Sequence, residues 1–458
     1  MRWGLLVRRE VSLVVVSLPE GGLYSYSSYS CPLVTRLCTY MSPCTAASAR
    51  DWQCPSVAML LSVIATAGIV LPPPVSSPLE AQAKAYFALG NRVVQQLGPT
   101  RAEDLEAALD SSFEFVAPLV GPLGKQAIIS ATAGLDLAEA IPNFDARYHD
   151  FRADPHDPRR LWCTMRVCGT QTGPLSFAGQ VAEPTTPPTR VESPPEAASL
   201  RFSSTGKLIE LTTGYPMDRR VGTTGGLGGL FGILEGLGRP LPPPLTRSTA
   251  ELLIPFLRLL GSAPPAPNVA LTTLPCLSES DRLSSDQLLG LTAALIESKF
   301  GVEDPSVLAD SFTFSTPVGP PSSKPAFLQS GWIDLKSAMP DLDYHYRDVR
   351  PCAFDVNRVW WTSSPVGTHT APLTMGSATY MPKGRRWESP PECGSAQFDA
   401  NGCCVGVTAG YVMDRRLGNT DGFGGIYGLC SALELPMPIP KWQLRTPVQN
   451  LARLRGES

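Results

Sequence analysis

The sequence predicts an α+β fold that occurs twice in the chain, and two observations predict it. The segment Gly214–Arg220 recurs almost unchanged as Gly410–Arg416, and a glycine-rich segment follows each copy, Val221–Gly232 and Leu417–Gly428. In each copy, helical periodicity comes first and strand periodicity follows, which is typical of the α+β class. We therefore expect an internal duplication, each copy holding three helices and then a long curved antiparallel sheet within about 150 residues.

Repeat one, residues 76–240, begins with three predicted helices. Apolar side chains recur at helical spacing in the first of them, at Tyr86, Leu89, Val93 and Leu97. The second helix is expected over residues 102–109. The third is expected from Gly124 to a point before Pro142, because proline cannot continue a helix.

Strands follow the helices of repeat one. Alternation puts four side chains on one face of a first strand, namely Phe144, Ala146, Tyr148 and Asp150. A second strand is expected over Leu161–Val167, and a hairpin pairs Leu200–Phe202 with Leu208–Tyr215.

Repeat two, residues 281–442, follows the same plan. Phe312–Phe314 matches Phe113–Phe115, and Pro340 matches Pro142. The matching first strand carries Leu342, Tyr344, Tyr346 and Asp348 on one face, and Trp360 matches Trp162.

The remaining segments do not have the pattern of a domain. Residues 1–75 are basic and serine-rich, and the apolar run Val57–Leu71 is too short for a stable membrane span but suits a targeting signal. We expect a leader for the plastid or the secretory pathway; the alternative is an over-long gene start, with Met59 opening a simple signal peptide or the protein staying in the cytoplasm. Residues 241–280 read as a proline-rich connector with a short apolar helix, Leu252–Leu260, and residues 443–458 as a tail.

Composition argues against several classes of partner and site. The net charge is −3 without a dense basic run, so nucleic acid is not an expected partner. The 12 cysteines form no CxxC pair and none is matched between the repeats, so neither a metal site nor a shared disulfide is expected.

Four short segments of repeat two carry a family resemblance. They are Ala338–Asp343, Asp355–Trp360, Val366–Leu373 and the hairpin turn at Gly402, and in this order they resemble SnoaL-like polyketide cyclases of the nuclear transport factor 2-like superfamily. Repeat one matches through Ala140–Asp145, Arg160–Trp162, Cys168–Leu175 and Ser204–Ile209. The resemblance implies two tandem cone-shaped domains, each with a sheet curled around a deep apolar pocket.

The resemblance also implies chemistry. Cyclases of this kind use an aspartate as general acid–base, sometimes with a histidine, on an apolar substrate that bears a carbonyl group, and they need no cofactor. His369 fits the histidine, but repeat one has Gln171 there. Asp218 and Asp414 match the aspartate of the last strand only approximately.

Strand alternation gives separate candidates for the site. Tyr148 and Asp150, like Tyr346 and Asp348, should line one cavity, where aromatic walls would raise the pKa of the carboxyl group. The alternative is that each aspartate ends its strand in water or is bonded to a turn. Further candidate ligand-binding residues are the matched aromatic side chains Tyr215, Tyr411, Trp162 and Trp360.

The segments Asp218–Arg220 and Asp414–Arg416 allow two interpretations. They hold either a catalytic acid beside anion-binding guanidinium groups or a structural ion-pair corner, and we favour the structural corner. The glycine-rich segments do not fit a phosphate loop, because no Lys-Ser/Thr follows them. We expect tightly packed turns that lead into short helices over residues 230–237 and 426–433.

Two hypotheses follow for function. In the first, each cone binds a hydrophobic small molecule, with or without cofactor-free acid–base chemistry of the cyclase, isomerase or hydrolase type. In the second, the protein is a non-catalytic binding or scaffold protein whose two domains pack as an intramolecular pseudo-dimer. Assembly into a homo-oligomer is compatible with both.

Overall fold

The computed structural model describes residues 77–95, 100–118, 120–133, 137–177, 180–238, 277–317, 321–330 and 334–437. The leader, the connector helix and the tail expected from the sequence lie outside these residues. All the described residues belong to one compact unit of the chain. Among them, none of the helices is long and apolar enough to cross a membrane.

The helices of repeat one follow the predicted order. They are α3 (Ser77–Gln95), α4 (Thr100–Ala108), α5 (Lys125–Ala133), α6 (Leu137–Ala140) and, near the end, α7 (Gly229–Gly236). Helix α3 buries Leu79, Ala83 and Phe87, which are spaced four residues apart and so share one face. The predicted third helix is divided into α5 and α6, and α6 ends before Pro142 as expected.

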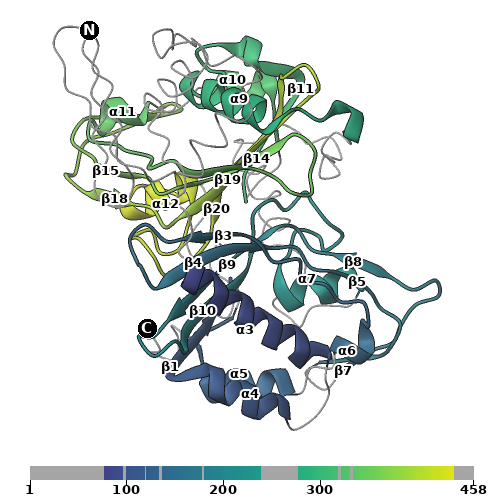
Figure 1. Cartoon of the computed structure of the whole chain (residues 1–458). Coiled ribbons are helices and arrows are strands. Elements are labelled where there is room, and N and C mark those ends of the chain that lie inside the picture. The colour runs from purple at the N-terminus through teal and green to yellow at the C-terminus, as the bar shows by residue number, and fades with distance from the viewer. Residues whose placement is uncertain are drawn as a thin grey trace, which may run out of the picture. The chain divides into compact units, whose positions relative to one another are not determined.

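Ten strands make up the sheets of repeat one. They are β1 (Leu109–Val116), β2 (Leu123–Gly124), β3 (His149–Ala153), β4 (Arg160–Met165), β5 (Cys168–Thr170), β6 (Leu175–Phe177), β7 (Gln180–Ala182), β8 (Arg190–Glu192), β9 (Glu196–Phe202) and β10 (Leu208–Pro216). Six of them form one sheet in the order β2-β1-β10-β9-β4-β3, while β5 pairs with β8 and β6 pairs with β7. Helix α3 lies along this sheet, with α4 and α5 beside β1 (Figure 1).

Repeat two follows the same order, but the short 3-10 helix η2 stands where repeat one has α4, so the helix predicted there is shorter in this repeat. Its helices are η1 (Glu279–Asp281), α9 (Ser285–Glu297), η2 (Pro305–Val307), α10 (Lys324–Ser330), α11 (Leu335–Ala338) and α12 (Gly425–Ala432). Its strands are β11 (Leu308–Ser315), β12 (Ser322–Ser323), β13 (Arg347–Pro351), β14 (Arg358–Ser363), β15 (Val366–Thr368), β16 (Leu373–Met375), β17 (Ala378–Tyr380), β18 (Arg386–Glu388), β19 (Glu392–Phe398) and β20 (Cys404–Val412). The sheet order β12-β11-β20-β19-β14-β13 repeats that of repeat one.

The sheets are mixed, which corrects the prediction of purely antiparallel sheets. Strand β1 runs parallel to β10, and β11 runs parallel to β20, whereas the other pairs of each large sheet are antiparallel. Strands β2–β9 lie between β1 and β10 in the sequence. The chain therefore connects β1 to β10 by a crossover and not by a hairpin, which allows the two strands to run parallel.

A bulge near the start of β3 and of β13 overturns the predicted alternation. The pairing register of β3 shifts between His149 and Arg152, and Asp150 has a positive φ of 53°. Strand β13 repeats the bulge, with a φ of 55° at Asp348. A bulge adds a residue and turns the following side chains to the other face. Consequently Tyr148 and Asp150 do not share a face, and neither do Tyr346 and Asp348.

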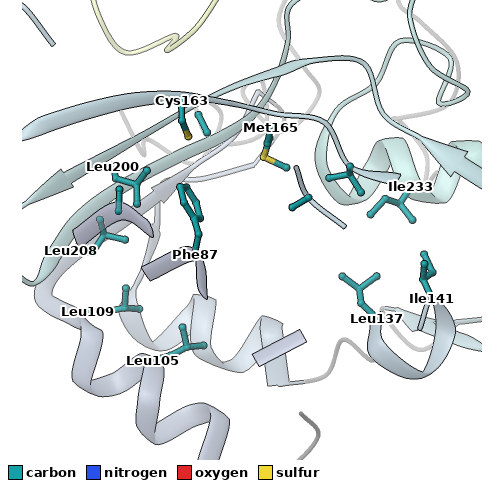
Figure 2. Packing of buried hydrophobic residues seen from close by; sticks show 14 of the residues in the cluster. Phe87, Leu105, Leu109, Leu137, Ile141, Cys163, Met165, Leu200, Leu208 and Ile233 are labelled. Atoms are coloured by element: carbon teal, nitrogen blue, oxygen red, sulfur yellow. The ribbon is translucent and has the colours of Figure 1, made fainter. Parts of the chain in front are cut away.

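The side of the sheet that carries Tyr148 is the core side of repeat one. Buried apolar side chains from all its main elements form one continuous cluster there, and Figure 2 shows part of it around Phe87, Leu200 and Leu208. The ring of Tyr148 stacks on that of Phe87 with their centroids 3.6 Å apart. The described apolar side chains of repeat one therefore form a single core on this side of the sheet.

The opposite sides of the two sheets meet each other through reciprocal ion pairs. In each pair a carboxylate of one repeat contacts an arginine of the other. Each pair has a matched pair in which the carboxylate and the arginine come from the opposite repeats. The pairs are Asp218–Arg358 at 3.0 Å, Asp414–Arg160 at 3.4 Å, Asp150–Arg350 at 3.0 Å and Asp348–Arg152 at 3.4 Å. Such exchange of roles is the signature of an isologous contact, as in dimers with two-fold symmetry.

An apolar cluster fills the space around these ion pairs. It combines side chains of both repeats, namely Trp162, Ala197, Tyr215, Met217, Cys352, Trp360, Cys393, Tyr411 and Met413. Ion pairs in a dry interface keep their strength because little water screens them, but their desolvation is costly unless every charge is paired.

We predict that Asp218→Asn lowers the free energy of unfolding by about 3–5 kcal/mol, because it leaves two buried guanidinium groups, Arg220 and Arg358, without their carboxylate. Denaturant unfolding of the full chain measures this. The matched control is Asp343→Asn, whose carboxylate is 66% exposed and should cost less than about 1 kcal/mol. Equal effects of the two changes would contradict a buried ion-pair corner at Asp218.

Candidate functional site

A cavity of about 670 Å³ opens at repeat two, and residues of repeat one also border it. Aromatic side chains from α10, from the strands and from the loops between them form part of its wall: Phe300, Phe314, Phe327, Tyr344, Tyr346, Trp361 and Trp387. Tyr344 and Tyr346 stack with their centroids 5.4 Å apart, and Phe300 lies 5.9 Å from Trp361. The buried apolar side chains of this repeat form two separate clusters, unlike the single cluster of repeat one.

The lining of the cavity differs from repeat one at matched positions. Trp361 in β14 lines the cavity, where repeat one has Cys163. Ser363 also lines it, where repeat one has Met165, and the longer methionine side chain is buried in the core of repeat one. The two repeats therefore surround their glutamates with different side chains at these positions.

A glutamate lies in the wall of the cavity. Glu392 is the first residue of β19 and is 4% exposed. Its carboxylate oxygen Oε1 accepts a hydrogen bond from the hydroxyl group of Ser389 and another, of 2.8 Å, from the backbone N–H of Gly425. Burial raises the pKa of Glu392, while these two donors pull the pKa in the opposite direction.

Repeat one holds a matching glutamate. Glu196 is fully buried, and its Oε2 accepts a 3.0 Å hydrogen bond from the backbone N–H of Gly229. Burial raises the pKa of Glu196 to about 7. Its other oxygen, Oε1, is buried without a hydrogen-bond partner among the described residues. The two repeats therefore share a buried carboxyl group, and in repeat two this group borders a cavity.

These glutamates are functional candidates that sequence reasoning missed. Both end the segment Glu-Ser-Pro-Pro-Glu, which occurs as residues 192–196 and again as residues 388–392. The repetition of this segment in both copies is the sequence signal that could have identified the two glutamates. The glycine-rich segments lead into the short helices α7 and α12, as predicted. These helices begin at Gly229 and Gly425, each one residue before the predicted start. Their first N–H groups would lack partners within the helix, and the glutamates supply them.

The predicted pairing of each tyrosine with an aspartate is not found, and a glutamate lies near the tyrosine instead. Burial raises the pKa of Tyr346 well above its ordinary value, and the neighbouring Tyr344 and Glu392 add to this shift. Glu196 likewise contributes, after burial, to the raised pKa of Tyr148. Tyr346 and Glu392 thus line the same cavity.

Asp150 and Asp348, predicted to line the cavities, lie instead between the repeats. Each is bound to an arginine of the other repeat, Arg350 and Arg152 respectively. Burial would raise the pKa of Asp150, but Arg350 and His149 outweigh this effect and lower it. The bulges described above are the physical reason, because they turn these carboxylates away from the tyrosines.

Asp218 and Asp414 form the ion-pair corner that we favoured. Asp218 accepts hydrogen bonds from the backbone N–H and the guanidinium group of Arg220, all at 3.0 Å, and Asp414 binds Arg416 in the same way at 2.9–3.1 Å. Both aspartates are fully buried. Burial would raise the pKa of Asp218, but Arg358 and Arg220 outweigh it and lower the pKa.

His369 is buried outside the lining of this cavity. Its backbone N–H donates to the carbonyl of Arg385, and burial lowers the pKa of its side chain. The matching Gln171 donates from its amide to the carbonyl groups of Gly173 and Ala182. The position therefore joins neighbouring loops in both repeats, and the structure does not bring His369 to the glutamate.

The matched tryptophans Trp162 and Trp360 belong to the apolar cluster between the repeats, not to the cavity. Neighbouring residues of a strand face opposite sides, so Trp361, and not Trp360, reaches the cavity. Tyr215 and Tyr411 are part of the same inter-repeat cluster, and both also line the cavity where it reaches the other repeat. Among the described residues there is no group of His, Cys, Asp and Glu that could hold a metal ion.

Comparison with known proteins gives similarities of fold. No family model matches the chain, and a search of curated proteins finds no match. Among solved structures the chain is similar to a protein described as a SnoaL-like polyketide cyclase from Jannaschia sp. CCS1 (15% identity, 31% of this chain and 87% of the other, TM-score 0.23). It is also similar to a steroid delta-isomerase from Pseudomonas aeruginosa (14%, 42% and 98%, TM-score 0.21) and to a nuclear transport factor 2-like protein from Anabaena variabilis (12%, 31% and 91%, TM-score 0.21).

The three matches cover 87–98% of the other proteins and 31–42% of this chain. At such low identity the likeness concerns the fold alone.

We predict that the chain becomes less stable as the pH rises from about 4.5 to about 7. In this window the folded protein keeps a proton on Glu196 that the unfolded chain has already lost, so raising the pH favours unfolding. Glu392 acts in the same direction. The change attributable to Glu196 should be on the order of 2–3 kcal/mol, measured by denaturant unfolding at a series of pH values.

The variant Glu196→Gln should flatten this pH dependence, because its side chain cannot ionise yet still offers an oxygen to the N–H of Gly229. Glu388→Gln, at a side chain that is 50% exposed, is the matched control and should leave the dependence unchanged. An unaltered slope in Glu196→Gln would show that this carboxyl group does not hold its proton in the folded protein.

Proposed function

We propose that repeat two binds an apolar small molecule in its cavity and that Glu392 acts on this molecule as a general acid–base group, without a cofactor. In this proposal the sheet of repeat two and its helices form a cone around the ligand. The observation that carries it is a buried carboxyl group of raised pKa in the wall of an aromatic cavity of about 670 Å³.

The geometry of Glu392 supports this role. Both hydrogen bonds to Glu392, from Ser389 and from Gly425, go to Oε1. They fix the orientation of the carboxyl group and leave Oε2 for a ligand. A carboxyl group whose pKa is raised holds its proton closer to neutral pH, so it can give a proton to a carbonyl oxygen or take one from the adjacent carbon. Isomerase, cyclase and hydrolase reactions all include such a step.

The candidates predicted from strand alternation and from the resemblance take supporting roles in this proposal. Asp150, Asp218, Asp348 and Asp414 hold the two repeats together as an intramolecular pseudo-dimer. Their carboxylates already bind arginine side chains through hydrogen bonds or ion pairs, so they are not available to a ligand in the cavity. Repeat one then serves as the partner of the active repeat.

Binding is tested with 2-acetylnaphthalene, an apolar aromatic ketone. We predict saturable binding to the full chain at one site per chain, measured by the change in fluorescence of the protein or the ketone. Ala409→Phe should weaken binding at least about tenfold, because Ala409 lines the cavity and the larger ring occupies it. Thr379→Phe, at an exposed position of β17, is the control and should bind as the unaltered chain does.

Acid–base chemistry is tested by exchange of the methyl protons of the bound ketone in deuterated water, followed by proton NMR. The Glu392 carboxylate takes a proton from the methyl carbon and the enolate forms; the carboxyl group then exchanges this proton with the deuterated water and returns a deuteron to the carbon. We predict that Glu392→Gln slows the exchange by about 10²–10⁴-fold, whereas Glu196→Gln does not. If the ketone binds but its exchange is no faster than in buffer, the alternative function, a non-catalytic binding or scaffold protein, is favoured.

A further inference from the structure

A serine lies three residues before each of the two buried glutamates. Ser193 precedes Glu196, and Ser389 precedes Glu392, within the repeated segment Glu-Ser-Pro-Pro-Glu. Both serine side chains are buried, and neither is among the described residues that line the cavity. A serine at this position can therefore influence a ligand only through the neighbouring glutamate.

The backbone holds the two serines in the same way. The N–H of Ser193 donates to the carbonyl of Val167, and the N–H of Ser389 donates to the carbonyl of Pro365, both at 2.8 Å. Val167 and Pro365 are matched, because each stands directly before a short strand, β5 in repeat one and β15 in repeat two. The two hydroxyl groups thus start from equivalent places, and a difference in their hydrogen bonds comes from the residues around them.

In repeat one the hydroxyl proton of the serine is directed to the backbone. The N–H of Val167 donates to Oγ of Ser193 at 3.0 Å, and this hydroxyl group donates in turn to the carbonyl of Pro194 at 2.8 Å. Ser193 lies close enough to Glu196 to oppose part of the rise that burial causes in the pKa of Glu196. Oε1 of Glu196 nevertheless has no hydrogen-bond partner of suitable geometry among the described residues.

In repeat two the donor that holds the serine is missing. A proline has no backbone N–H, so Pro365 cannot make the hydrogen bond that Val167 makes. The hydroxyl group of Ser389 donates to Oε1 of Glu392 instead, and Oε1 also accepts from the N–H of Gly425. Proline in place of valine accounts for this change of partner, and it occurs in the repeat whose glutamate borders the cavity.

The hydrogen bond from Ser389 has two effects on a carboxyl group that moves protons. Together with the N–H of Gly425 it fixes the orientation of the Glu392 carboxyl group, and both bonds leave Oε2 for a ligand. A hydroxyl group that donates to a carboxylate also stabilises the charged form. Burial raises the pKa of Glu392, and Ser389 opposes this rise more strongly than Gly425 does. Ser389 therefore favours the carboxylate, the form that takes a proton from a ligand.

We propose that Ser389 is a positioning residue of the site in repeat two: its hydroxyl group orients the Glu392 carboxyl group and favours the carboxylate form, and Pro365 allows this by leaving the hydroxyl group free to turn to Glu392. This inference rests on the proposed function, which it deepens by naming a residue that acts through Glu392. Repeat one lacks the arrangement, because Val167 engages its serine.

The test is the pH profile of methyl-proton exchange in 2-acetylnaphthalene, followed by proton NMR with the full chain and saturating ketone in deuterated water. In the unaltered chain the exchange rate rises as Glu392 loses its proton and then levels off. We predict that Ser389→Ala moves the midpoint of this rise to higher pH by about one unit or more, because the carboxylate loses a hydrogen bond. The dissociation constant of the ketone should change less than twofold, since Ser389 does not line the cavity.

Three further variants separate this role from an effect on folding. Ser389→Thr keeps a hydroxyl group and should keep the midpoint. Pro365→Val restores the N–H that repeat one has, so it should draw the hydroxyl group away from Glu392 and move the midpoint in the same direction as Ser389→Ala. The matched control is Ser193→Ala, which removes the corresponding hydroxyl group of repeat one and should leave the midpoint unchanged.

The outcomes distinguish this inference from the proposed function. A midpoint that stays in place in both Ser389→Ala and Pro365→Val, while Glu392→Gln still abolishes exchange, would overturn the inference and leave the proposed function standing. An equal shift in Ser193→Ala would also overturn it, because the effect would then not depend on the contact with Glu392. If the unaltered chain does not accelerate exchange at any pH, both proposals fail.

Discussion

The hydrogen bond from the first N–H of a short helix to a buried glutamate is the contact on which the rest of each repeat depends. It joins Gly229 to Glu196 in repeat one and Gly425 to Glu392 in repeat two. The helix has no side-chain cap of its own, so the glutamate satisfies a donor that would otherwise be buried without a partner. The close approach of the helix explains the glycines, since a Cβ atom at Gly424 would lie 2.2 Å from the carbonyl oxygen of Gly410. A carboxyl group needed for this contact is unavoidably placed at the wall of the interior, where burial raises its pKa.

The same contact has different chemical consequences in the two repeats because the surrounding volume differs. In repeat one, Met165 is part of the buried apolar cluster and the rings of Phe87 and Tyr148 stack on each other. In repeat two, Ser363 stands at the position of the methionine, and the rings of Phe300 and Tyr346 lie 6.5 Å apart. The contact between helix and glutamate occurs in both repeats, so it supports the fold of each whatever side chains surround it.

Much of this architecture could be predicted from the sequence, because it depends on patterns that span many residues. The repeated motif, the helices and the order of helices before strands follow from periodicity and from proline and glycine positions. The direction of single side chains could not be predicted at the bulges. Strand alternation assumes one residue per pleat, and the positive φ angles at Asp150 and Asp348 break that count, so both aspartates turn toward arginines of the other repeat. Glu196 and Glu392 were overlooked for another reason: a glutamate after two prolines has no local signal of burial, and only its repetition in both copies marks it.

Joining two copies in one chain removes a constraint that a symmetric dimer must obey. In a dimer of identical subunits every substitution occurs twice, so a residue near the axis faces its own copy and both interiors change together. In this chain several matched positions near the axis carry the same residue type, as with Tyr215 and Tyr411 or Arg219 and Arg415, and the contacts between them are reciprocal. Other matched positions differ, as with Cys163 and Trp361 in the interiors. Two interiors with different linings are therefore an arrangement that the fused chain can reach and that identical subunits cannot.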